Sequence, residues 1–141
     1  MRWFYFFAQC VLICSCSSSR VVVDRYPILK ENLPSYYIES PDPALEDPMK
    51  GQVLVCRYQI KSFDQKMVPY LLLLRVIYKN LDEETHSVAI YSSNGEVDFE
   101  ILGEKYEATR GVLTYRADLI TADGDLVADF KHRLWFEIIQ F

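Results

Sequence analysis

Apolar and polar residues alternate along most of the chain after residue 50. Successive side chains of a β-strand point to opposite faces, so this period of two predicts strands with one buried face. No window has the spacing of an amphipathic helix of useful length. Residues 51–141 are therefore expected to form an all-β domain. The apolar positions of the alternation are Leu54, Cys56, Tyr58 and Ile60; Tyr70, Leu72, Leu74, Val76 and Tyr78; Val97, Phe99 and Ile101; Leu113, Tyr115, Ala117 and Leu119; and Leu126, Ala128, Phe130, Leu134, Phe136 and Ile138.

The five glycines separate these alternating runs. They fall at the breaks, where turns need the positive φ angles that glycine adopts without strain. Asp123-Gly124, between two alternating runs, is the strongest hairpin signal in the chain. Several short strands separated by turn residues are typical of two packed antiparallel sheets. The predicted fold class is an all-β, antiparallel β-sandwich.

Two stretches of this region resemble strands of fibronectin type III and related immunoglobulin-like domains. Residues 51–58, GQVLVCRY, resemble the second strand, with Cys56 or Tyr58 where those domains place tryptophan. Residues 115–124, YRADLITADG, resemble the sixth strand, a tyrosine followed by alternating apolar residues and a turn. The resemblance implies an immunoglobulin-like or fibronectin III-like sandwich over residues 51–141. Many unrelated functions share such a scaffold, so the fold by itself implies none of them.

The start of the chain has the pattern of an export signal. Arg2 precedes an uncharged, mostly apolar run over residues 3–13, and small residues follow, which is the layout of a secretory signal peptide. The run is too short for a membrane span, which needs about 20 residues. Ile13-Cys14-Ser15-Cys16 resembles the lipobox of bacterial lipoproteins, with an aliphatic residue three positions and a small residue one position before the modified cysteine. The resemblance implies that residues 1–15 are a lipoprotein signal peptide and that Cys16 carries palmitate or a related lipid.

Other interpretations of this N-terminal region are kept open. Cys14 and Cys10 are poorer candidates for lipidation, because Ile13 and Gln9 would stand directly before the cleavage point. An ordinary secretory signal cut nearby would leave a soluble exported protein. The cysteine-rich end of the signal also resembles lipoproteins of chlamydiae. By analogy with enterobacterial lipoproteins, Ser17 after the modified cysteine favours the outer membrane.

Residues 16–50 contain five of the six prolines and no sustained periodicity. Proline cannot donate to a sheet and favours extended neighbours, so the segment is expected to be a Pro-rich tether. A tether of about 30 residues would hold the domain several nanometres from the membrane. One of two apolar runs, Val21-Val22-Val23 or Tyr36-Tyr37-Ile38, is expected to pack on the domain as a first edge strand.

Acidic residues concentrate in one part of the domain. Residues 82–107 hold eight acidic side chains and one basic side chain, Lys105. Glu96, Asp98 and Glu100 alternate with apolar residues, so they are expected on the outward face of one strand. We favour a solvated edge that prevents strand pairing, and the alternative is a docking face for a basic partner.

Trp135 and Arg133 form a second candidate binding patch. They have the parity opposite to that of the last apolar row, and an exposed aromatic ring beside arginine is typical of interface hot spots. Alternatively, Trp135 covers a second apolar layer, since Val127, Ile139 and Phe141 share its parity.

The sequence contains no motif for catalysis, for a metal or for a cofactor. His86, beside three acidic residues, is interpreted as part of a solvated loop, and His132 as a half-buried, hydrogen-bonded side chain. Cys56 is expected to be a buried thiol and not a nucleophile. The formal net charge of −5 and the pI near 5.0 argue against a nucleic-acid partner.

The predicted function is that of a lipid-anchored protein of the bacterial cell envelope, a binding or assembly module without enzyme activity. Its partners would be the membrane, through the N-terminal lipid, and an envelope protein. The alternative is a secreted soluble inhibitor or ligand-binding module that uses the acidic face. A small outer-membrane β-barrel that ends on an alternating strand at Phe141 is a further alternative.

Overall fold

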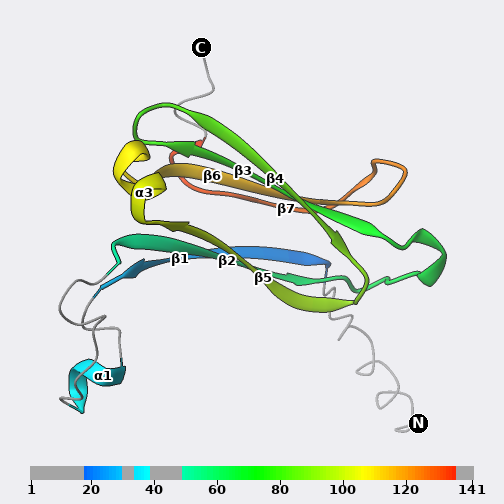
Figure 1. Ribbon diagram of the computed structural model, residues 1–141. Coiled ribbons are helices and arrows are strands. Elements are labelled where there is room, and N and C mark those ends of the chain that lie inside the picture. Colours follow the sequence, from blue (N-terminus) through cyan, green and yellow to red (C-terminus); the bar gives the residue numbers. More distant parts are fainter. Residues whose placement is uncertain (1–17, 30–33, 39–48, 136–141) are drawn as a thin grey trace, which may run out of the picture.

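The computed structural model describes residues 18–29, 34–38 and 49–135. Within them, the strands form two antiparallel sheets that pack face to face (Figure 1). The three-stranded sheet has the order β1-β2-β5 and the four-stranded sheet the order β4-β3-β6-β7. The predicted antiparallel β-sandwich is therefore confirmed. The strands are β1 (Arg20–Ile28), β2 (Gly51–Gln59), β3 (Tyr70–Tyr78), β4 (Glu83–Ile90), β5 (Asn94–Leu102), β6 (Val112–Ile120) and β7 (Leu126–Lys131).

The strand order is that of an immunoglobulin-like sandwich with one exchange. A constant-type immunoglobulin domain has its first, second, fifth and fourth strands in one sheet and its third, sixth and seventh in the other. Here the fourth strand, β4, pairs with β3 and so belongs to the second sheet. Of the two stretches that resemble immunoglobulin-like strands, residues 51–58 lie on the second strand, β2, and residues 115–124 cover the second half of the sixth strand, β6, and most of the turn after it.

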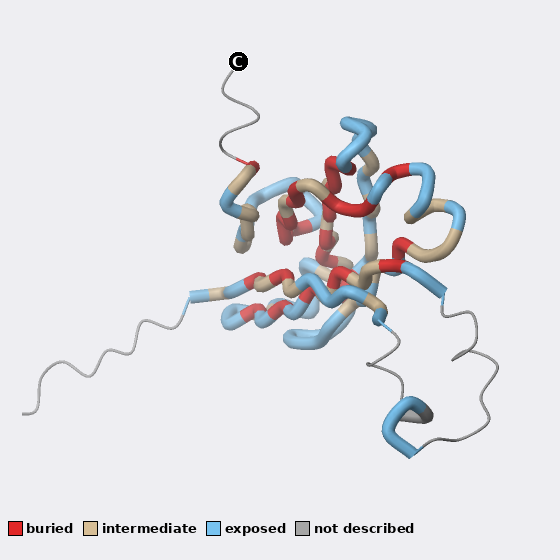
Figure 2. The backbone as a smooth tube through the Cα atoms, turned by 90° about the vertical axis from the view of Figure 1, so that its left-hand side faces the viewer, coloured by how far each residue is buried: buried red, intermediate tan, exposed pale blue. Residues whose placement is uncertain are grey.

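The core lies between the two sheets and is made by the inward parity of each strand. Leu54 and Cys56 of β2 and Leu72 and Leu74 of β3 belong to one cluster, and all four side chains are fully buried. Burying one such aliphatic side chain contributes about 1.5–3 kcal/mol. Figure 2 shows the resulting alternation of buried and exposed positions along the strands. Among the residues that the structure describes, seventeen buried ones form one continuous apolar cluster.

The expected first edge strand is formed by the earlier of the two apolar runs that were candidates for it. β1 pairs with β2 along its whole length, from Arg20 opposite Gln59 to Ile28 opposite Gly51. The apolar run Val21-Val22-Val23 supplies this edge strand, because Val21 and Val23 are buried against the core. The edge strand expected within residues 16–50 is therefore confirmed at Val21-Val22-Val23, and the sandwich starts at Arg20, earlier than the predicted domain boundary at residue 51.

The second apolar run of that segment does not pack on the sandwich. It lies in and after a short helix, α1 (Pro34–Tyr37), where Tyr36, Tyr37 and Ile38 are all exposed. Residues 29–50 thus form an insertion between two paired strands, whose ends emerge at the same end of the sandwich (Figure 1).

Other differences from the expectation concern short helices and the last strand. A seven-residue helix, α3 (Gly103–Thr109), and a 3-10 turn, η2 (Gln65–Met67), connect strands. β7 ends at Lys131, after which the chain turns and the Trp135 amide donates to the His132 carbonyl at 2.9 Å. The predicted continuation of that strand to Ile138 is therefore wrong for the residues up to Trp135, and the remainder lies outside the described residues. In the described part of the chain, no helix has the length and apolar character that crossing a bilayer requires.

Each sheet edge carries charged side chains or proline. β5 presents the acidic residues of the alternating run, and β7 presents Asp129 and Lys131. β4 begins with two glutamates, and β1 contains Pro27, which has no amide hydrogen to offer a further strand. Charges and proline at edges discourage pairing with strands of other molecules.

Candidate functional site

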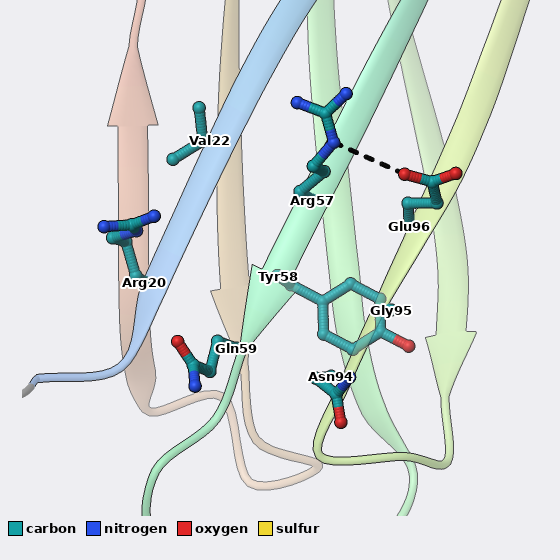
Figure 3. Close-up of a pocket in the computed structure, with 8 residues that line it drawn as sticks. All are labelled: Arg20, Val22, Arg57, Tyr58, Gln59, Asn94, Gly95 and Glu96. Atoms are coloured by element: carbon teal, nitrogen blue, oxygen red, sulfur yellow. Dashed lines mark hydrogen bonds and ion pairs between the residues drawn. The ribbon is translucent and has the colours of Figure 1, made fainter.

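The outward face of the three-stranded sheet carries a polar arrangement centred on Arg57. Register places Val22 of β1 and Glu96 of β5 on either side of Arg57, which lies on the central strand β2. The Arg57 guanidinium donates to a carboxylate oxygen of Asp24, to Oε2 of Glu96 at 3.3 Å and to the Tyr26 hydroxyl at 3.3 Å. Figure 3 shows the Arg57–Glu96 pair spanning β2 and β5. One cation thus links all three strands of the sheet.

Beside this pair the outward face is hollowed. The hollow has a volume of about 520 Å³ and opens widely to solvent. Gly95 allows the ring of Tyr58 to come close, since a Cβ at residue 95 would lie 2.6 Å from the Tyr58 hydroxyl oxygen. That hydroxyl is 2.8 Å from the Ser92 hydroxyl, so it already has a partner. The lining residues are Arg20, Val22, Arg57, Tyr58, Gln59, Asn94, Gly95 and Glu96.

The predicted acidic face continues from this hollow along β5. Glu96, Asp98 and Glu100 are all exposed on the outward face of an edge strand, as the alternation predicted. Glu96 is paired with Arg57, whereas Asp98 and Glu100 lie opposite the uncharged Val55 and Val53. Within the described residues, Asp98 and Glu100 make no ion pair. The far half of the row is therefore an acidic strip that a partner can reach.

The predicted patch of Trp135 and Arg133 is not formed as expected. Trp135 is 5% exposed, whereas Arg133 is exposed. The parity argument failed because β7 ends at Lys131 and the following turn changes the direction in which side chains point. An exposed aromatic hot spot at Trp135 is therefore ruled out in this structure. The interpretation that the ring covers apolar residues fits its burial.

A second polar cluster, which the sequence did not predict, lies between β4 and α3. Glu84 Oε2 accepts a hydrogen bond from the Tyr78 hydroxyl at 2.5 Å and lies 2.6 Å from Lys105 Nζ. Glu84 Oε1 lies 3.5 Å from His86 Nε2, and the His86 ring packs on Phe99 at 5.2 Å between centroids. The interpretation of His86 as part of a solvated loop is therefore wrong, since it lies on β4. The sequence feature that pointed to this cluster was Lys105, the single basic residue among the acidic residues of positions 82–107.

Burial and charge shift the pKa values in this cluster. Burial raises the pKa of Tyr78, and the adjacent Glu84 carboxylate raises it further. Partial burial alone would raise the pKa of Glu84, but hydrogen bonds from Lys105 and Tyr78 outweigh that effect, so its pKa is below the ordinary value. Tyr78 thus stays a neutral donor and Glu84 an ionised acceptor at neutral pH. Because each group already has its partner, the cluster ties β3, β4 and α3 together.

We expect this cluster to stabilise the protein at neutral pH and to lose its effect in acid. The pKa of Glu84 is lower in the folded protein than in the unfolded chain, where it is about 4.3. The ionised carboxylate therefore stabilises the folded state fully at pH values above about 4.3, and this stabilisation is lost as the pH falls through the folded pKa. Glu84→Gln should lower the free energy of unfolding by about 1 kcal/mol or less at pH 7, since the side chain is 37% exposed and screened by water. At pH 3 the free energies of unfolding of the natural protein and of Glu84→Gln should differ less. Urea unfolding at both pH values measures this.

Glu83→Gln serves as the control for that substitution. Glu83 is the neighbouring residue, has the outward parity and is exposed, so its replacement should change stability little at either pH. If Glu84→Gln lowered the free energy of unfolding equally at pH 3 and pH 7, the stabilising role of the Glu84 carboxylate would be contradicted.

The remaining chemically capable groups are held inside the fold. Cys56 is fully buried, and burial, with a smaller effect of Asp98, raises the pKa of its thiol to about 12. Desolvation and the charge of Arg25 lower the pKa of His132. The His132 Nδ1 atom lies 3.4 Å from the Thr114 hydroxyl, so it is half-buried with a polar neighbour, as predicted. Residues 18–29, 34–38 and 49–135 contain no group of three or more His, Cys, Asp or Glu side chains placed to hold a metal ion.

These features define a domain class: an immunoglobulin-like β-sandwich with an arginine-centred hollow and an acidic edge on one outward face. No protein-family model and no curated protein matches the chain. In structure, the chain is similar to an immunoglobulin-like protein from Pseudomonas aeruginosa, with a TM-score of 0.40, 14% sequence identity and coverage of 82% of this chain and 94% of that chain. The class assigned here follows from the strand order and register of the chain itself.

Proposed function

We propose that this protein is a lipid-anchored component of a bacterial cell envelope and that its sandwich is a binding or assembly module. The observation that carries the proposal is Ile13-Cys14-Ser15-Cys16, which resembles a lipobox and follows an apolar run of signal-peptide length. The lipid on Cys16 would hold the protein in the outer membrane. An envelope protein would be the partner of the sandwich.

The position of the first strand supports this proposal. β1 begins at Arg20, so cleavage before Cys16 would remove the apolar run and leave every strand of the sandwich intact. The buried thiol of Cys56 is unsuited to lipidation in the folded protein. Each buried methylene of an acyl chain contributes about 0.8 kcal/mol, so a multiply acylated cysteine is a durable anchor.

Metabolic labelling with a clickable fatty acid, followed by membrane fractionation, tests the anchor. The natural protein should be labelled and sediment with membranes, and Cys16→Ala should abolish the labelling completely. Cys14→Ser is the matched control, because it changes a cysteine two positions away and keeps Ile13, Ser15 and Cys16. This control should still be labelled. Labelling that persists in Cys16→Ala would contradict the proposed site.

The second candidate function is a soluble exported module that captures a basic protein. The acidic strip of Asp98 and Glu100, without ion pairs in the described residues, favours this possibility. Absence of labelling in the natural protein, together with its recovery in the soluble exported fraction, would support this alternative. Binding through such a strip should weaken steeply as ionic strength rises.

A further inference from the structure

The chain between the proposed lipid and the sandwich is very short. Ser19 is already fixed to the domain, because its hydroxyl accepts a hydrogen bond from the Lys61 amide at 3.1 Å. An extended chain advances at most about 3.3–3.6 Å per residue, so the three steps from Ser19 to Cys16 reach only about 10–11 Å. If Cys16 is lipidated, which is the proposed function, Ser19 must stay within that distance of the bilayer surface.

The topology brings three connections to the same end of the sandwich as Ser19. β2 ends beside the start of β1, so the β2–β3 connection over residues 60–69 lies there. The β4–β5 turn over residues 91–93 and the β6–β7 turn over residues 121–125 lie at this end as well (Figure 1). We call this the anchor end. α3 and the ends of the β1–β2 insertion lie at the opposite end.

Each of the three connections at the anchor end presents one large apolar side chain to solvent. Met67 is 43% exposed, Tyr91 is 68% exposed, and Leu126, the residue after the β6–β7 turn, is 57% exposed. Single exposed apolar residues are common, and the opposite end has its own, including Leu29 and Leu81. Exposed apolar residues alone therefore do not show which end of the sandwich lies against the membrane. The short distance from Cys16 to Ser19 places the anchor end there.

Charges at the anchor end neither drive nor oppose contact with a bilayer. The basic residues are Arg20, Lys61 and Lys66, and the acidic residues are Asp64, Asp123 and Asp125. Three positive and three negative groups leave no net charge, so apolar contact and the lipid tether would supply the attraction, even for zwitterionic lipids. A tyrosine ring suits the boundary between headgroups and acyl chains, because it has an apolar body and a polar tip.

We infer that the sandwich stands end-on on the membrane, with Met67, Tyr91 and Leu126, which lie in or next to the three connections, against the bilayer surface. The strands then run away from the membrane. The end of β1, the start of β2 and α3 lie at the end that points away from the lipid.

Polarity-sensitive dyes on the lipidated mature protein, residues 16–141, test this orientation in phosphatidylcholine vesicles. Tyr91→Cys and, as a control of similar exposure at the opposite end, Leu81→Cys each receive a thiol-reactive dye; Tyr91 is 68% and Leu81 72% exposed. The native Cys56 thiol is buried, and Cys16 is occupied by lipid in this experiment. The dye at residue 91 should show a blue-shifted emission and several-fold weaker quenching by aqueous iodide than the dye at residue 81.

Flotation of the same vesicles separates the two possible failures. Protein that floats while both dyes are quenched equally has the anchor and overturns the end-on orientation. Protein that does not float overturns the anchor, and with it the orientation. Met67→Cys is a second probe at the anchor end in case Tyr91→Cys does not fold, as judged by circular dichroism, and the same protection is expected there.

Discussion

Leu72→Ala is expected to lower the free energy of unfolding by about 3–5 kcal/mol. Leu72 is fully buried on the central strand β3, where register places it between Val88 of β4 and Leu119 of β6. Removing its side chain loses transfer energy and leaves a cavity that two hydrogen-bonded sheets cannot easily close. Domains of this size are stable by only about 5–15 kcal/mol, so the loss is a large share of the total.

Urea unfolding followed by circular dichroism measures this effect. The midpoint should fall while the slope of free energy against urea stays the same, because the surface exposed on unfolding hardly changes. Leu81→Ala is the control: Leu81 is 72% exposed in the β3–β4 turn, and its replacement should change stability by less than about 0.5 kcal/mol. Equal losses for the two variants would show that the buried face of β3 is misassigned.

Gly51→Ala is expected to destabilise the protein by about 1–3 kcal/mol, although alanine normally suits a strand better than glycine. A Cβ at residue 51 would lie 2.6 Å from the Ile101 carbonyl oxygen and 3.1 Å from the Leu102 Cα atom. Both obstacles are backbone atoms of β5, so the end of the β2–β5 pair would have to move apart. The Gly103 amide, which donates to the Lys50 carbonyl at 3.0 Å, would be displaced with it.

Gly95→Ala provides the comparison for that substitution. Its Cβ would also come within 2.6 Å of a neighbour, but the neighbour is the hydroxyl at the tip of the Tyr58 side chain. A side-chain tip can shift, so Gly95→Ala should lower the free energy of unfolding less than Gly51→Ala does. Thermal or urea unfolding of both variants measures this. If Gly51→Ala is neutral, β2 and β5 do not approach as closely as the structure has them.

The alternating strands were predictable because a half-buried sheet leaves a direct mark on the sequence. Tyr70, Leu72, Leu74, Val76 and Tyr78 share one parity, and β3 begins and ends at the two tyrosines. The outward placement of the acidic residues of β5 follows from the same parity. In both cases, each side chain is explained by the face on which it lies, without knowledge of distant residues.

β4 was not predictable in this way, because polar groups occupy its inward parity. Glu84 and His86 lie opposite Val76 and Leu74 of β3, so the strand lacks the apolar alternation of its neighbours. Lys105 of α3 lies 2.6 Å from Glu84 and compensates its charge, so the carboxylate is tolerated at an inward position of the strand. A single sequence does not reveal that a residue twenty-one positions away supplies the compensating charge.

β1 and Trp135 show two other limits of the pattern. β1 is separated from its partner β2 by an insertion of 22 residues that is rich in proline. The sequence therefore left open which of two apolar runs supplies the edge strand, and it placed the start of the domain at residue 51. Trp135 was placed by extending a parity beyond the true end of its strand. In the candidate site, the acidic row was predictable, whereas the hollow at Arg57 depends on three strands brought together only by folding.

The charged sheet edges have a consequence for crowding. Molecules held in one plane meet their neighbours far more often than molecules in solution, and exposed strand edges are the surfaces through which β-proteins join into fibres. The four edge strands of the described part of the chain, β1, β4, β5 and β7, all carry charge or proline. With the proposed lipid anchor, many copies would therefore lie side by side on a membrane at high density and remain separate, because no edge invites pairing with a neighbour.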